Sequence, residues 1–134
     1  MNKLMKKDKK GFTLIEVIVV LVILAILAAI LVPSMIGWIN KANEKTAIVE
    51  GRSVLLACQT IASEKYKTYA GTKAESDFTD TADALTLAEL KSPAAISAAK
   101  IDTSGKVASF TYNDSSDKYT VTYTAAGGFT SVKK

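Results

Sequence analysis

An unbroken apolar run with a single acid constrains this chain more than any other feature. From Phe12 to Val32 the sequence has 21 residues, and Glu16 is the only charged one among them. At about 1.5 Å per residue, a helix of this length crosses a hydrocarbon core of about 30 Å. We therefore expect a membrane-spanning helix. A carboxylate inside such a span costs about 2.5–3.5 kcal/mol on insertion scales and usually marks a functional contact, so Glu16 should have a partner.

The positive charge of the chain is concentrated before this run. The chain has 17 Lys and Arg residues against 13 Asp and Glu residues, a formal net charge of +4. Residues 1–11 hold five of the lysines and one aspartate, so residues 12–134 are neutral overall. Positive charge beside a span keeps that end in the cytoplasm. The basicity therefore predicts membrane orientation, and we expect no direct nucleic-acid binding.

The composition argues against catalysis. The sequence contains no histidine, which excludes Ser-His-Asp and Cys-His catalysis and every histidine metal site. It also lacks a phosphate-cradling glycine loop and a metal-ligand constellation, so we expect no enzyme, no catalytic residue, no cofactor and no metal. The single cysteine, Cys58, cannot form an intrachain disulfide, and it is expected to be a small buried hydrophobe.

The N-terminal region differs from an ordinary secretory signal. The apolar run is longer than the usual 7–15 residues, and Ala25, Ala28 and Ala29 do not have the spacing of an A-x-A cleavage site. One alternative is an uncleaved single-span anchor that displays a small binding domain. That alternative explains the lysines and the span, but it leaves Gly11 and Glu16 without a role.

The stretch Lys10-Gly11-Phe12-Thr13-Leu14-Ile15-Glu16 resembles the prepilin processing site of type IV pilins and their relatives. The resemblance covers about the first forty residues, including Pro33 just beyond the span. It implies that a membrane prepilin peptidase cuts after Gly11 on the cytoplasmic side. It also implies that the new amino group of Phe12 is then N-methylated.

The resemblance further implies a filament subunit, a type IV pilin that membrane lipid holds before assembly. The implied partners are the prepilin peptidase, a pilus assembly ATPase with its membrane platform protein, minor pilins, and further copies of the chain in a helical filament. The precursor would lie in the cell membrane and the product at the cell surface. A pseudopilin of a type II secretion or competence DNA-uptake system shares the same N-terminal features, and this alternative stays open.

Glu16 gains a specific role on this interpretation. Four residues, about 6 Å of helix, separate the Phe12 amine from the Glu16 carboxylate within one subunit. In a staggered bundle, Glu16 of an incoming subunit can instead meet the Phe12 amine of a neighbour. Such a pair would neutralise a charge that is costly in lipid.

We predict one long helix from about Phe12 to Ala70. Pro33 removes a backbone hydrogen bond and Gly37 lowers helix propensity, so a kink is expected at these two residues. The predicted segments are a basic leader at 1–11, a transmembrane and filament-core helix at 12–33, an amphipathic continuation at 34–70 and a globular α/β head at 71–134.

The continuation of the helix is predicted to bury one face. Glu50 is expected on the opposite, polar side, and Gly71 suits the helix end. The apolar positions recur every seven residues at Ile48, Leu55, Ala62 and Tyr69, and Cys58 lies on the same stripe.

The head is predicted to add a polar loop, a short helix from Ala82 to Leu90, and a second alanine-rich turn after Pro93. Alternating residues then predict three strands. The expected fold is α+β, with the long N-terminal α-helix packed on a small three-stranded antiparallel sheet. The strand positions are Ala108, Phe110 and Tyr112 on one face of the first, Tyr119, Val121 and Tyr123 on one face of the second, and Phe129 to Val132 for the third.

The turn at residues 113–117 raises the question of calcium. Asn113, Asp114 and Asp117 are oxygen-bearing side chains of the kind that calcium prefers. Their spacing matches no recognised calcium motif. The alternative is an Asn/Asp/Ser turn that joins two strands.

Overall fold

The structure, a computed structural model, describes residues 10–65 and 76–134. The chain divides into two compact units, Met1–Ile39 and Asn40–Lys134. The helix α1, Leu14–Glu64, contributes to both of them. The second unit also contains the short helix α3, Thr81–Leu87, and an antiparallel sheet. This is the predicted α+β class.

The helix α1 agrees with the predicted long helix, with a later start. It begins at Leu14 and continues through Pro33 and Gly37 without interruption. It ends at Glu64, before the predicted end at Ala70. Ala70 and the glycine that follows it lie outside the described residues. The predicted kink stays a prediction, because continuity of the helix does not measure a bend.

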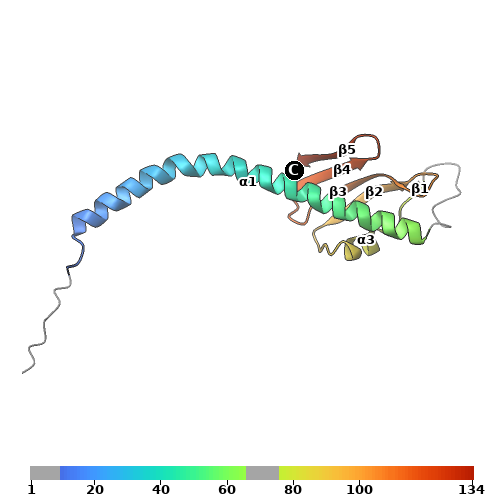
Figure 1. Ribbon diagram of the computed structural model, residues 1–134, viewed down its shortest axis with the longest axis horizontal. Coiled ribbons are helices and arrows are strands. Elements are labelled where there is room, and N and C mark those ends of the chain that lie inside the picture. Colours follow the sequence, from blue (N-terminus) through green and yellow to red (C-terminus); the bar gives the residue numbers. More distant parts are fainter. Residues whose placement is uncertain (1–9, 66–75) are drawn as a thin grey trace, which may run out of the picture. The chain divides into compact units, whose positions relative to one another are not determined.

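The sheet has five strands among the described residues, so the prediction of three strands is wrong. They are β1, Ser76–Asp77; β2, Ala95–Ile101; β3, Val107–Asn113; β4, Tyr119–Thr124; and β5, Gly128–Lys133. Each strand pairs antiparallel with the next in chain order (Figure 1). The three predicted strands are β3, β4 and β5.

The two additional strands lie where the residue pattern is weak. The alanine-rich segment expected to form a turn is β2, because pairing with β3 overrides the helix preference of alanine. A register shift between Ser97 and Lys100 breaks the alternation of β2, and Ala98 there has φ 50°. The strand β1 has only two residues. The predicted short helix is α3, which ends at Leu87 rather than at Leu90.

The core of the second unit lies between α1 and one face of the sheet (Figure 1). Phe110, Tyr112 and Val121 contribute large buried side chains from the sheet, in agreement with the predicted faces. The helix contributes a stripe that is rotated from the predicted one, since Ile48 and Leu55 are only partly buried. The buried positions of α1 are Ala47, Gly51, Val54, Ala57, Cys58, Ile61 and Ala62.

The helix and the sheet approach each other closely at Gly51. A Cβ atom at Gly51 would lie 3.1 Å from Val121 Cγ1 and 3.5 Å from Phe129 Cε1. The distance to Phe129 is ordinary contact, but the distance to Val121 would require that side chain to move by a few tenths of an ångström, so glycine suits this packing. Gly37 in the first unit differs, because a Cβ atom there meets nothing within 4 Å.

Polar contacts join α1 to the sheet around this core. The Gln59 side chain accepts a hydrogen bond from the Val107 amide at 3.0 Å and donates one to the Gly105 carbonyl at 3.2 Å. The Tyr119 hydroxyl donates to the Asn40 carbonyl at 3.0 Å. These contacts fix the position of the helix along the sheet.

Candidate processing and assembly site

The start of α1 is closed by a reciprocal pair of hydrogen bonds. The Thr13 amide donates to Glu16 Oε2 at 3.0 Å, and the Glu16 amide donates to Thr13 Oγ1 at 3.3 Å. This arrangement is a capping box, in which two amides that lack helical partners are satisfied by side chains. The signal was present in the sequence, because Thr13-Leu14-Ile15-Glu16 is a T-x-x-E pattern before an apolar run. The donor is a neutral backbone amide, so the expected partner that neutralises the charge of Glu16 stays a prediction.

Gly11 and Phe12 lie immediately before this capped start. Both residues are exposed and neither is helical, and Phe12 is 88% exposed. A Cβ atom at Gly11 would meet nothing within 4 Å, and the backbone of Gly11 is not in the left-handed region. The fold of this chain therefore places no steric demand for glycine at this position. A demand for glycine here would come from a partner.

Phe12 and Glu16 lie together, but not along one helix. Both line a shallow apolar groove with Val17, Val20 and Leu21. Because α1 begins at Leu14, Phe12 precedes the helix, and the predicted 6 Å of helical rise does not describe the separation of the two groups. The Glu16 carboxylate accepts a hydrogen bond from the Thr13 amide in this structure.

The helix that follows is apolar and exposed throughout the first unit. Its large hydrophobic side chains, from Leu14 to Ile39, are between 44% and 79% exposed. An 18-residue stretch of α1 has a mean hydropathy of 3.4, and none of it is buried. By length and composition this part of the helix can cross a membrane. It needs an apolar surrounding that the described residues do not supply.

Pro33 and Gly37 occupy the helix beyond this stretch. Pro33 has no amide hydrogen, so the Ala29 carbonyl has no helical donor four residues later. The Ser34 hydroxyl donates to the Leu31 carbonyl at 2.8 Å, within the same turn. The open space at Gly37 leaves room for a neighbouring surface.

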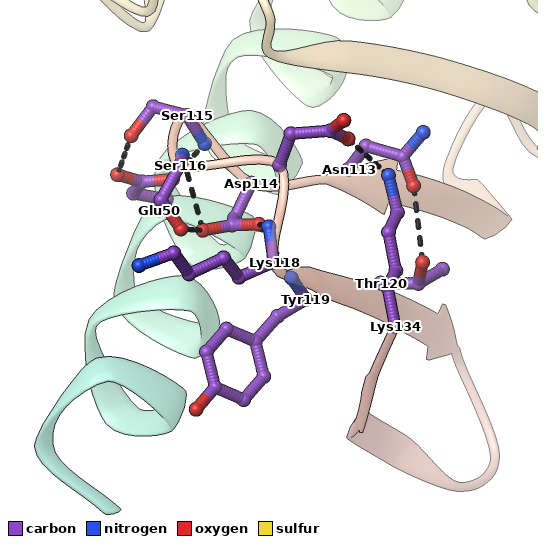
Figure 2. A network of polar contacts seen from close by, with 10 residues as sticks. Glu50, Asn113, Asp114, Ser115, Ser116, Lys118, Tyr119, Thr120 and Lys134 are labelled. Atoms are coloured by element: carbon purple, nitrogen blue, oxygen red, sulfur yellow. Dashed lines mark hydrogen bonds and ion pairs between the residues drawn. The ribbon is translucent and has the colours of Figure 1, made fainter. Parts of the chain in front are cut away.

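The loop between β3 and β4 is organised by Asp114, which is only 4% exposed (Figure 2). Its Oδ1 accepts hydrogen bonds from the amides of Lys118 and Tyr119 at 2.9 and 2.7 Å. Its Oδ2 accepts bonds from the Ser116 amide at 3.2 Å and from the Ser116 hydroxyl. A carboxylate has about four lone-pair positions, so these donors occupy Asp114 fully.

The same donors shift the acidity of Asp114. Burial alone would raise its pKa, but the hydrogen bonds from the Ser116 side chain and the Tyr119 amide favour the ionised form. The pKa of Asp114 is therefore lowered from its ordinary value of 3.8. This geometry is that of an Asn/Asp/Ser turn between two strands.

The other two calcium candidates also have protein partners. Asn113 Oδ1 accepts a hydrogen bond from the Thr120 hydroxyl at 3.1 Å, and Asp117 pairs with the Lys134 ammonium group. Within residues 10–65 and 76–134, no cluster of three His, Cys, Asp or Glu side chains has the arrangement of a metal site. Asp114 therefore holds its own loop together, and Asp117 links the loop to the residue after β5.

Glu50 contradicts the prediction that it lies on the polar side of the helix. It accepts a hydrogen bond from the Ser115 amide at 3.0 Å (Figure 2). It also accepts one from the Tyr112 hydroxyl at 2.8 Å, so it faces the sheet. Burial, followed by the hydrogen bond to Glu50, raises the pKa of Tyr112 above its ordinary value. The spacing from Ala47 to Val54 passes through Glu50, so a stripe counted at three- and four-residue steps would have included it.

Cys58 is fully buried in the core, as predicted. Burial raises the pKa of its thiol to about 12, which keeps it in the unreactive thiol form at neutral pH.

Comparison with known proteins gives one finding. The prokaryotic N-terminal methylation motif matches residues 6–32, and this is the class of type IV pilin-like prepilin processing motif. The chain carries this motif, which supports a type IV pilin-like or pseudopilin precursor in general. The motif and the apolar helix are consistent with a membrane-anchored precursor. Neither a curated protein nor a solved structure matched the chain.

Proposed function

We propose that this chain is the structural subunit of a type IV pilus filament. On this proposal it enters the membrane as a prepilin, is cleaved after Gly11 and is N-methylated at Phe12. It then polymerises through α1, and the head formed by the second unit is carried to the cell surface. The observation that carries the proposal is the methylation motif, in which the exposed, non-helical Gly11 and Phe12 directly precede an apolar, unburied helix.

The exposure of the first half of α1 supports polymerisation. Water is a poor environment for a helix whose large side chains are all at least 44% exposed from Leu14 to Ile39. In the precursor, the hydrocarbon chains of lipid surround these apolar side chains. In the filament, the same surface of other copies replaces lipid, and Ala25, Ala28 and Ala29 permit close helix packing.

Transfer from lipid to filament needs an energy source. The gain from helix packing must match what lipid already provides to the same apolar side chains, so hydrophobic burial alone gives little net drive. An assembly ATPase acting through a membrane platform protein would supply the work. Minor pilins would be further partners of the growing filament.

Glu16 gives the assembly its charge selectivity. Cleavage creates an amino group on Phe12, and a positive charge at the beginning of a helix is unfavourable because the helix dipole is positive there. The Glu16 carboxylate of the same or a neighbouring subunit can neutralise that amine. A chain that keeps its leader has no such amine and offers no such pair.

Fractionation of cells that express the chain tests this proposal. The proposal expects surface filaments that shear from the cells and contain the cleaved chain. A cleaved chain confined to the membrane, with loss of secretion or transformation on gene deletion, would instead support the pseudopilin. An uncleaved chain in the membrane would support the single-span anchor.

A further inference from the structure

The capping box sets the boundary between the helix and the preceding residues. The first backbone bond of the helical ladder runs from the Val17 amide to the Thr13 carbonyl, at 3.3 Å. Thr13 is thus the N-cap residue, and Glu16 occupies the third helical position. The chain leaves the helical conformation at a position set by two side chains.

This boundary matters because the bond to be cleaved lies just outside it. The Gly11 carbonyl is two residues before the first carbonyl of the ladder, and Gly11 and Phe12 are exposed and non-helical. In hydrolysis, water attacks the Gly11 carbonyl carbon and the bond to the Phe12 nitrogen breaks. The hydroxyl group stays on Gly11 and a proton goes to Phe12. A carbonyl engaged in a helical hydrogen bond would be less accessible to this attack.

The local sequence offers a competing helix start. Glycine is about as good an N-cap as threonine, so Gly11 can replace Thr13 in this role. In a helix capped at Gly11, the Gly11 carbonyl would accept a hydrogen bond from the Ile15 amide. Phe12 would then occupy the first helical position, and the scissile peptide would belong to the helix.

We infer that Thr13 is a positioning residue for leader cleavage. Its hydroxyl, with the Glu16 carboxylate, holds the start of α1 after the scissile Gly11–Phe12 peptide, so that the peptidase meets this peptide in a non-helical form. The inference rests on the proposed cleavage after Gly11. It gives Glu16 a role before cleavage that does not need the Phe12 amine.

The test uses the full chain in phospholipid vesicles with purified prepilin peptidase. Thr13→Ala removes the capping hydroxyl, and we expect cleavage about two- to tenfold slower at limiting substrate, which is the scale of a lost N-cap. Thr13→Ser keeps a hydroxyl and should restore the rate. Thr46→Ala is the matched control, because the Thr46 hydroxyl donates to the Ala42 carbonyl of the same helix at 3.0 Å, far from the cut.

A second readout separates positioning from a general structural defect. Carbonyl and Cα chemical shifts of Gly11 and Phe12 in the uncleaved chain should move toward helical values in Thr13→Ala and return in Thr13→Ser. Glutamine also serves at the third position of a capping box, so Glu16→Gln should be cleaved faster than Glu16→Ala.

The outcomes distinguish this inference from the proposed function. A Thr13→Ala chain that is cleaved at the parent rate, or a Thr13→Ser chain that is equally slow, would overturn the positioning role while leaving the proposed function intact. A parent chain that the peptidase does not cut after Gly11 would overturn both.

Discussion

The two halves of α1 have opposite relations to the rest of the chain. In the first unit, the large side chains from Leu14 to Ile39 are exposed, and none of the most apolar stretch is buried. In the second unit, the same helix buries a stripe that includes Val54 and Cys58, both 0% exposed, against the sheet. One continuous helix is thus exposed along its first half and packed against a sheet along its second half.

The difference predicts which substitutions in α1 act on folding and which act on function. The second half of α1 contributes to a core with large side chains from the sheet, so substitutions there should act on folding. The first half has no such core among the described residues. Its substitutions should act through partners, whether peptidase, lipid or other copies of the chain.

The largest effect is expected from Gly11→Val. The chain itself has room for the added side chain, because a Cβ at Gly11 meets nothing within 4 Å. A peptidase that must approach this carbonyl closely should be misaligned, and cleavage should slow by about a hundredfold or more. Gly37→Val is the matched control, since Gly37 is equally open and should leave cleavage unchanged. Leader removal followed by gel mobility measures both, and efficient cleavage of Gly11→Val would refute a peptidase demand for glycine.

Glu16→Gln is expected to reduce filament assembly by at least about tenfold. Glutamine can preserve the cap, but it leaves the Phe12 amine without its countercharge, and an unpaired buried charge costs about 3–5 kcal/mol. Glu64→Gln, an exposed acid near the described end of the same helix, is the control. The quantity of sheared filaments per cell measures the effect. Normal filament yield from Glu16→Gln would show that charge pairing is unnecessary.

Val54→Ala should lower the free energy of unfolding of the head by about 2 kcal/mol, because it removes buried methyl groups and leaves a cavity. Val49→Ala, at a position 61% exposed on the same helix, should change it by less than about 0.5 kcal/mol. Denaturant unfolding of the full chain in detergent, followed by tyrosine circular dichroism, gives both values. Equal losses of unfolding free energy in the two variants would mean that Val54 does not contribute to a buried core.

The smallest effect is a loss of head stability in acid. Because the folded-state pKa of Asp114 lies below its ordinary value of 3.8, the unfolded chain binds the proton more readily. The stabilisation is present above about pH 4–5 and is lost as the pH falls through the folded pKa. Asp114→Ala should reduce this pH dependence, and exposed Asp77→Asn should not. Asp102, whose pKa is also lowered by hydrogen bonding from Ser104, will leave a residual slope in every variant.

The sequence predicts the strongly patterned parts of this molecule. The apolar run gives the helix of the first unit, and the alternation around Phe110 and Val121 gives β3 and β4. The weakly patterned β2 is different, because its alanines favour helix and only pairing with β3 makes it a strand. The secondary-structure propensity of a segment does not reveal the strand with which that segment pairs elsewhere in the chain.

In the candidate site, too, some features follow from the sequence pattern and others depend on the folded structure. Gly11, Phe12 and Glu16 were assigned from their order along the chain, and the methylation motif confirms the class of that segment, while the role of each residue stays a prediction. The contact between Thr13 and Glu16 follows from a helix start that the sequence placed two residues too early. Glu50 was assigned to the wrong side because a seven-residue repeat centred on Ile48 is rotated from the true stripe.

Whether this chain is a processed filament subunit is tested by the mass of its N-terminal peptide in sheared-surface and membrane fractions of native cells. We expect a peptide that begins at N-methylated Phe12 in the sheared material. An intact leader in both fractions would contradict it.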